Sequence, residues 1–305
     1  MLLAIVITIV SLAVLLVASD WFIDSAEKIG LSLGISPFII GVTIVAFGTS
    51  LPELATSIAS VYGGASEFVI GNVIGSNITN ILLVLGLTVL IGKEIKLDFN
   101  IWDIDMPILI GSAFLMFFTL QDQSLSMVEC IIYLVALAAF LFNSVQGSGT
   151  NSEDRQKVRM FDVGKLILGG VFVFLGAKWT IYGIVEFSTI VGIGAEIISL
   201  SFVALGTSLP EIAVSMAAAK RGKHAIAVGN VLGSNIFNTY AVMAIPSFFG
   251  SLEIPAGILV FSLPFMLAVT ILFGIITVTK RITFWEGVML LILYAYYMKE
   301  LFFAM

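Results

Sequence analysis

Long apolar stretches, each interrupted by only a few polar residues, recur along the whole chain. Each is close to the roughly 20 residues that an α-helix needs to cross the hydrocarbon core of a bilayer. The pattern therefore predicts an all-α polytopic membrane protein in which short polar loops join the spans. We expect ten transmembrane helices, over residues 2–25, 36–62, 67–91, 104–120, 125–146, 162–186, 195–220, 224–249, 256–278 and 282–303.

One clearly polar linker, QGSGTNSEDRQKVRM at Gln146–Met160, divides the predicted spans into two groups of five. Composition agrees with a bilayer environment, because only 11% of the residues are charged, whereas about 25% is usual in soluble domains. The net charge of −6 is spread over the loops and forms no basic stripe, so a nucleic-acid partner is not expected. The expected partner is the lipid bilayer, and no obligatory protein partner is evident.

Basic residues divide unequally between the two sides of the predicted bundle. The loops after spans 1, 3, 5, 7 and 9 hold twelve lysines and arginines, and the opposite side holds Lys299 alone. Cytoplasmic loops of membrane proteins are enriched in basic residues. We therefore expect an integral protein of the plasma (inner) membrane, with these twelve residues in the cytoplasm and both termini on the extracellular or periplasmic side.

The chain repeats itself at an offset of 158 residues. Ala46–Ser57 matches Ala204–Ser215 at 9 of 12 positions, and Gly71–Asn80 matches Gly229–Asn238 at 8 of 10. Each half has an odd number of predicted spans, so the second copy must enter the membrane upside down, as in many secondary transporters. We expect a first five-helix repeat over 1–146, a cytoplasmic linker over 147–161, and an inverted second five-helix repeat over 162–305.

The sequence FGTSLPE in span 2 places Glu53 among apolar neighbours, and LGTSLPE in span 7 places Glu211 likewise. Proline removes a helical hydrogen-bond donor and glycine adds flexibility, so Gly48 and Pro52 predict a broken or kinked helix 2, and the second copy predicts the same for helix 7. A break frees backbone carbonyls, which need a partner in hydrocarbon. Thr49 and Ser50 lie within one helical turn of Glu53.

Span 3 and span 8 add further oxygen-bearing side chains at helical spacing, and carboxylate, hydroxyl, amide and carbonyl oxygens are ligands that suit calcium and sodium. We expect Asn77 and Asn235, about 100° further round their helices, to serve packing or support. The predicted metal ligands are Glu53, Thr49, Ser50, Ala46, Ser76 and Asn80 from the first half, and Glu211, Thr207, Ser208, Ala204, Ser234 and Asn238 from the second. The predicted supporting residues are Asn72, Asn230, Pro52 and Pro210.

Two carboxylates inside a membrane favour an exchange mechanism. A charge at the bilayer centre costs roughly 2.5–3.5 kcal/mol on insertion scales, and spans 2, 3, 7 and 8 contain no internal basic residue to pair with either glutamate. One divalent cation, or two monovalent cations, would neutralise both charges. The empty and fully ionised site is then the state to avoid, which predicts antiport of a divalent cation against monovalent ones.

The two motifs, G-T-S-L-P-E followed by G-N-x-x-G-S-N-x-x-N, resemble the two α-repeats of the cation/calcium exchanger superfamily, in particular its prokaryotic sodium/calcium exchanger branch. The resemblance implies a ten-helix fold, a central calcium site at Glu53 and Glu211, and sodium sites that draw on the hydroxyl and carbonyl ligands named above. It also implies that spans 1 and 6 slide against the other eight. Ca²⁺ and Na⁺ would be transported substrates, and no cofactor is expected.

The sequence departs from some relatives at Asn238, where potassium-dependent members carry an acid. This difference favours sodium over potassium, and the absence of an extra acid beside the Gly-Asn pairs favours sodium over protons. A proton-coupled calcium or cation antiporter remains the alternative, because Glu53 and Glu211 could carry protons. A passive cation channel is a weaker alternative, since channels usually build an acidic ring from several subunits. An enzyme is not expected, because the chain offers no nucleophile–base pair.

Overall fold

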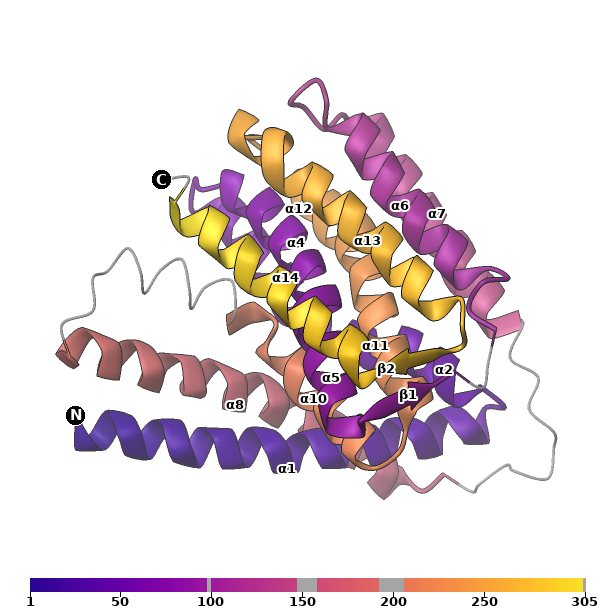
Figure 1. Cartoon of the computed structure of the whole chain (residues 1–305). Helices are drawn as coiled ribbons and strands as arrows, with labels where there is room; N and C mark the ends of the chain where they lie inside the picture. Colours follow the sequence, from indigo (N-terminus) through magenta and orange to yellow (C-terminus); the bar gives the residue numbers. More distant parts are fainter. Residues whose placement is uncertain (98–99, 147–157, 192–205, 304–305) are drawn as a thin grey trace.

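The chain folds into a bundle of helices with one small antiparallel ladder (Figure 1). The computed structural model describes residues 1–97, 100–146, 158–191 and 206–303. Several of the described helices are long and apolar enough to cross a membrane, so the protein is a mostly helical membrane protein. These six stretches are Leu2–Ser32, Pro37–Tyr62, Glu67–Gly92, Met127–Ser144, Met160–Val191 and Ile258–Thr277, and Asp105–Thr119 is a shorter apolar helix.

Helices occupy the predicted spans of the first half. Two of these spans contain a π-helical turn between two α-helices. The elements are α1 (Leu2–Ser32), α2 (Pro37–Ile40), η1 (Gly41–Val45), α3 (Ala46–Tyr62), α4 (Glu67–Thr79), η2 (Asn80–Val84), α5 (Leu85–Gly92), β1 (Glu94–Lys96), α6 (Asp105–Thr119) and α7 (Met127–Gln146).

The described part of the second half follows the same course. Residues 195–205 of predicted span 7 lie outside the described residues, so the total of ten spans stays a prediction. The elements are α8 (Met160–Val191), α10 (Leu209–Lys220), α11 (His224–Phe237), η4 (Asn238–Val242), α12 (Met243–Ser247), η5 (Ile258–Ser262), α13 (Leu263–Thr277), β2 (Arg281–Thr283) and α14 (Phe284–Phe303).

The break predicted in span 2 is wrong. The helical path is continuous from Pro37 to Tyr62, and Pro52 lies inside α3. Membrane helices tolerate an interior proline because neighbouring helices and hydroxyl side chains satisfy the freed backbone groups. In span 7 the helix is interrupted at Ser208, which has turn geometry, and Pro210 stands in the first turn of α10. Proline removes no helical hydrogen bond at that position.

Structural elements of the two halves recur at the same 158-residue offset as the sequence repeat. The π-turn η2 begins at Asn80 and η4 begins at Asn238, each directly after the Gly-Asn motif of its half. A π-turn inserts one extra residue into the helical ladder, and such turns often mark functional sites. The two asparagines therefore occupy equivalent local positions in the two halves.

Helices α1 and α8 lie side by side along one flank of the bundle (Figure 1). Two glycines of α8 permit this close packing, because a Cβ on Gly176 would lie 2.9 Å from the Leu15 backbone and one on Gly183 would lie 2.4 Å from Thr8 Oγ1. Only 28% of the residues in the apolar stretch of each helix are buried, against 72% for Glu67–Gly92. The pair is thus peripheral, and the centre of the bundle lies around α4, η2 and α5.

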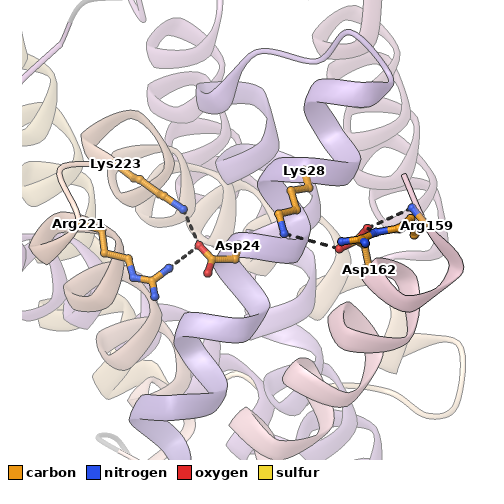
Figure 2. Close-up of polar contacts among 6 residues, drawn as sticks. All are labelled: Asp24, Lys28, Arg159, Asp162, Arg221 and Lys223. Carbon is orange, nitrogen blue, oxygen red and sulfur yellow. Dashed lines mark hydrogen bonds and ion pairs between the residues drawn. The ribbon is translucent and has the colours of Figure 1, made fainter. Parts of the chain in front are cut away.

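Ion pairs attach the end of α1 to the turn between α10 and α11 (Figure 2). Arg221 pairs with Asp24 and, at 2.9 Å, with Asp20, and Lys223 pairs at 2.8 Å with both Asp24 and Glu27. The Asp24 hydrogen bond raises the pKa of Arg221. Burial alone would lower the pKa of Lys223, but its hydrogen bonds to Asp24 and Glu27 outweigh this and raise it.

A second ion-pair group joins α1 to the start of α8. Asp162 lies 3.7 Å from Lys28 and 3.8 Å from Arg159 (Figure 2). Elsewhere at this end of the bundle, β1 pairs antiparallel with β2, with Ile95 opposite Ile282. These contacts join the end of α1, the start of α8 and the turn between α10 and α11, and they pair β1 with β2.

Candidate metal centre

Two glutamates lie in the interior of the bundle. Glu53 belongs to α3 and Glu211 to the first turn of α10, and both side chains are 0% exposed. Each glutamate is the last residue of the same hexapeptide, Gly-Thr-Ser-Leu-Pro-Glu. The burial of both carboxylates agrees with the predicted interior site.

Hydrogen bonds between the halves bring the two hexapeptides together. Ser50, three residues before Glu53, donates from Oγ to Glu211 Oε1 at 3.0 Å. Thr49 donates to Asn230 Oδ1 at 3.1 Å and lies 3.5 Å from Ser234 Oγ. The equivalent contact of the other half is also present, because the hydroxyls of Ser76 and Thr207 are 3.5 Å apart. The hexapeptide of each half therefore faces the Gly-Asn motif of the other half.

The supporting asparagines occupy matching positions. Asn72 donates from Nδ2 to Ser57 Oγ at 3.0 Å and to the Glu53 carbonyl at 3.3 Å. Asn230 donates from Nδ2 to Ser215 Oγ at 2.9 Å. The sequence reasoning did not assign a role to Ser57 or Ser215, although each ends the twelve-residue match and lies four residues after its glutamate. That duplicated spacing is the signal that could have identified them.

Several buried oxygen atoms in this region have no hydrogen-bond partner among the described residues. They include both carboxylate oxygens of Glu53, Oε2 of Glu211, the Ser208 hydroxyl and the amide oxygens of Asn80 and Asn238. The Ala46 carbonyl accepts from Thr49 Oγ1 at 3.3 Å, and Pro210 is buried whereas Pro52 is half-buried. Ala204 lies outside the described residues.

The electrostatic balance of the region is negative. None of the ion pairs within the described ranges involves Glu53 or Glu211. A buried charge is normally paired or bound to a metal. Carboxylate, hydroxyl and amide oxygens together form a hard donor set of the kind that binds sodium and calcium. The geometry thus supplies what a cation site requires, namely negative charge, oxygen donors and shelter from lipid.

Comparison with known proteins places the chain in a family. The model of the sodium/calcium exchanger protein family matches residues 3–146 and 162–302. The sodium/calcium exchanger MaX1 of Methanosarcina acetivorans is 32% identical over 344 residues, covering 97% of this chain and 98% of that protein. The inner membrane protein YrbG of Escherichia coli is 31% identical, covering 90% of this chain and 89% of that protein.

A solved structure is also similar over nearly the whole chain. It is that of the sodium-calcium exchanger NCX_Mj soaked with 2.5 mM Na⁺ and 1 mM Sr²⁺, with a TM-score of 0.86, 31% sequence identity, and coverage of 97% of this chain and 98% of that chain. The resemblance predicted from the two motifs is thereby confirmed. The chain is an integral membrane transporter and belongs to the sodium/calcium exchanger protein family.

Proposed function

We propose that the protein exchanges calcium for sodium across the membrane and that Glu53 and Glu211 hold the transported cations. The observation that carries this proposal is the pair of fully buried glutamates, linked across the halves by Ser50 and without a basic partner within the described ranges. Hydroxyl and amide groups from both halves complete the donor set. Family membership and the names of the similar exchangers support the choice of sodium and calcium.

The two carboxylates explain why transport in one direction would require an ion in the other. Two ionised carboxylates close together and out of water repel each other and lack solvation. Calcium, or sodium ions in sufficient number, removes both costs. The loaded protein can therefore change its access from one side to the other, whereas the ion-free and ionised protein changes access reluctantly. Coupling follows from this difference.

The ten-span and inverted-repeat organisation belongs to the same proposal. The matching contacts of Asn72 with Ser57 and of Asn230 with Ser215, at an offset of 158 residues, support two equivalent halves. The hydrogen bond from Ser50 to Glu211 supports a meeting of the two halves at the midplane. The peripheral pair α1 and α8 would move against the remaining helices to alternate access. Both termini would face outward from the plasma (inner) membrane, since the basic loops gather at the opposite end.

Ion gradients imposed on proteoliposomes test the coupling ion. We expect uptake of labelled calcium to require sodium inside, to proceed without a pH gradient and to be unaffected by potassium. Uptake driven by an outward proton gradient alone would instead favour a proton-coupled antiporter. Flux that needs no counter-ion on the opposite side would favour a passive channel, and either result would overturn sodium/calcium exchange.

Substitution of the glutamates tests the site. We expect Glu53→Gln and Glu211→Gln each to abolish calcium uptake, because one carboxylate cannot neutralise a divalent ion in this interior. Glu67→Gln is the matched control, since Glu67 is an exposed glutamate at the start of α4. Wild-type calcium affinity in either of the first two variants would contradict the proposed site.

Asn238→Asp tests the central position of the donor set. The added carboxylate would lie at the start of η4, where both amide atoms of Asn238 lack partners among the described residues. We expect a changed ion dependence, either a potassium requirement or proton coupling, with the fold retained. Unchanged dependence on sodium and calcium would argue that Asn238 lies outside the transported ion's reach.

A further inference from the structure

Asn77 and Asn235 occupy the same position in the two Gly-Ser-Asn motifs, yet they bind different partners. Asn235 accepts a hydrogen bond at its Oδ1 from Asn80 Nδ2, at 3.3 Å. Asn77 donates from Nδ2 to Thr239 Oγ1 at 3.0 Å and lies 3.7 Å from Met266 Sδ. Both asparagines are buried, with exposures of 3% for Asn77 and 1% for Asn235. The repeat is thus broken at one buried polar contact between the halves.

The residue after the central asparagine differs between the halves at the site of the broken symmetry. Thr239 follows Asn238 in the second half, and Ile81 follows Asn80 in the first half. The Thr239 hydroxyl accepts a hydrogen bond from Nδ2 of Asn77, whose Oδ1 has no partner among the described residues. Ile81 offers no such acceptor to Asn235, whose Nδ2 has no partner within the described ranges while its Oδ1 accepts from Asn80. Asn238, in contrast, has no partner for either amide atom within the described residues.

The contact with Asn235 determines which end of the Asn80 amide is free. An asparagine amide has a donor end and an acceptor end. The donor end of Asn80 is used by Asn235, while its Oδ1 is buried without a partner among the described residues. Asn80 begins η2, which packs against α10, the helix that carries Glu211. An oxygen in that position suits a cation, whereas an NH₂ group would repel it.

We propose that Asn235 is a positioning residue, which orients Asn80 so that its carbonyl oxygen, and not its NH₂ group, serves the transported cation. Asn77 has no such role toward Asn238, because Asn77 Oδ1 and Asn238 Nδ2 have no hydrogen-bond partner among the described residues. This inference rests on the proposed cation site and adds a determinant of calcium affinity that touches no cation itself. It also makes the two central asparagines unequal: Asn80 is held in place and Asn238 is not.

Replacement of Asn235 by leucine, which is similar in size and has no acceptor, tests the proposal. We expect Asn235→Leu to raise the KM for calcium roughly tenfold, as the loss of one orienting hydrogen bond would do, and to leave the maximal rate nearly unchanged. Asn77→Leu is the matched control, since it removes an equivalent amide from the other half but no contact to Asn80. It should change the KM by less than about twofold.

A double-mutant cycle separates positioning from packing. If Asn235 acts through Asn80, then Asn235→Leu should have no further effect on the KM in an Asn80→Ala background. If it only fills space, the two effects will multiply, and the proposal fails. Asn235→Asp provides a rescue, because it retains the acceptor, and it should keep at least the wild-type calcium affinity. A loss as large as that of Asn235→Leu would also overturn the proposal.

The same experiments keep this inference apart from the proposed function. Should the glutamate site be wrong, Glu53→Gln would transport calcium normally. Should only the positioning role be wrong, Glu53→Gln would remain inactive while the Asn235 and Asn80 effects multiply. Size-exclusion profiles and thermal unfolding of each purified variant establish that a change in KM reflects the site rather than the fold.

Discussion

The two Gly-Asn motifs have nearly the same sequence, but Asn77 of the first binds Thr239 whereas Asn235 of the second binds Asn80. In α11 a Cβ built on Gly233 would lie 2.2 Å from the Val42 carbonyl oxygen, and one on Gly229 would lie 2.5 Å from that of Phe38. Glycine is therefore required where α11 crosses α2 and η1. At the offset of the repeat, the segment equivalent to α2 and η1 is residues 195–203, which lie outside the described residues.

This difference shows that two copies of a motif can make different contacts in one structure. An inverted-repeat transporter places its two halves in unequal positions whenever access is open to one side. If this chain has the proposed inverted repeats, unequal surroundings for equal sequences are expected, and each copy would have to suit both kinds of surroundings. Paired substitutions at equivalent positions of the two halves test whether their contacts differ.

The largest effect is expected from the glycines themselves. Gly233→Ala would place a methyl group against a backbone oxygen that cannot turn away, so we expect a loss of stability of about 3 kcal/mol. Gly111→Ala, at an exposed glycine inside α6 where a Cβ would meet no described atom within 4 Å, should be neutral or stabilising by up to about 1 kcal/mol, because alanine favours the helix more than glycine does. Thermal unfolding of the two purified variants in detergent measures both. Equal losses would contradict the packing described for α11.

Much of the fold was predictable because the bilayer imposes a simple rule on the sequence. Apolar runs of about 20 residues predict spans wherever they occur, and every predicted span contains a described helix. The exception is the break near Pro52, where tertiary packing overrides a local signal. Glycine and proline predict a weak point in the helix, but the surrounding helices decide whether it opens.

The next prediction compares the stability effects of replacing the serines that lie three residues before the two glutamates. Ser50 donates to Glu211, whereas the Ser208 hydroxyl has no partner among the described residues. A hydrogen bond to a charged group contributes about 1.5–3 kcal/mol. We expect Ser50→Ala to destabilise the cation-free protein by about 2 kcal/mol and Ser208→Ala to leave it unchanged. Thermal unfolding in chelator and potassium buffer measures both, and the reverse order would contradict the geometry.

The candidate site was predictable in composition but not in its connections. Glu53 and Glu211 stand out because no basic residue occurs within their predicted spans, and both are buried. The separate contacts of Asn77 and Asn235 could not be predicted, because they depend on whether residue 81 or 239 offers a hydroxyl across the interface between halves. Contacts of that kind arise from tertiary packing, which a helical repeat of polar residues does not specify.

A smaller effect is expected from the two prolines. Pro52 lies inside α3 and deprives it of one backbone donor, whereas Pro210 lies in the first turn of α10, where that donor has no helical partner. We expect Pro52→Ala to stabilise the protein by about 1 kcal/mol, less than the ~3 kcal/mol typical of soluble helices, since membrane helices commonly satisfy freed backbone groups through neighbouring helices and hydroxyl side chains. Pro210→Ala should have no measurable effect. A larger gain in stability from Pro210→Ala than from Pro52→Ala would contradict the helix positions given for the two prolines.

The smallest effect on stability is expected from the turns that follow α3 and α10, the helices that carry Glu53 and Glu211. The turn Lys220–Lys223 carries the ion pairs to α1, whereas the equivalent turn Tyr62–Ala65 contains no charged residue. Partly exposed ion pairs contribute about 0.2–1 kcal/mol each. Arg221→Ala should therefore lower stability by about 1 kcal/mol or less. Lys220→Ala is the control, because Lys220 is exposed and makes no ion pair within the described ranges.

Salt distinguishes an electrostatic contribution from a packing one. At about 1 M ionic strength the screening length falls to about 3 Å, so choline chloride, which supplies no transported cation, should remove most of the difference between Arg221→Ala and the wild-type protein. A difference that persists in 1 M salt would mean that the Arg221 stem, and not its charge, holds α1 to this turn. In that case the contrast between the two turns would be one of side-chain volume, and a neutral residue of similar length, as in Arg221→Met, would restore stability.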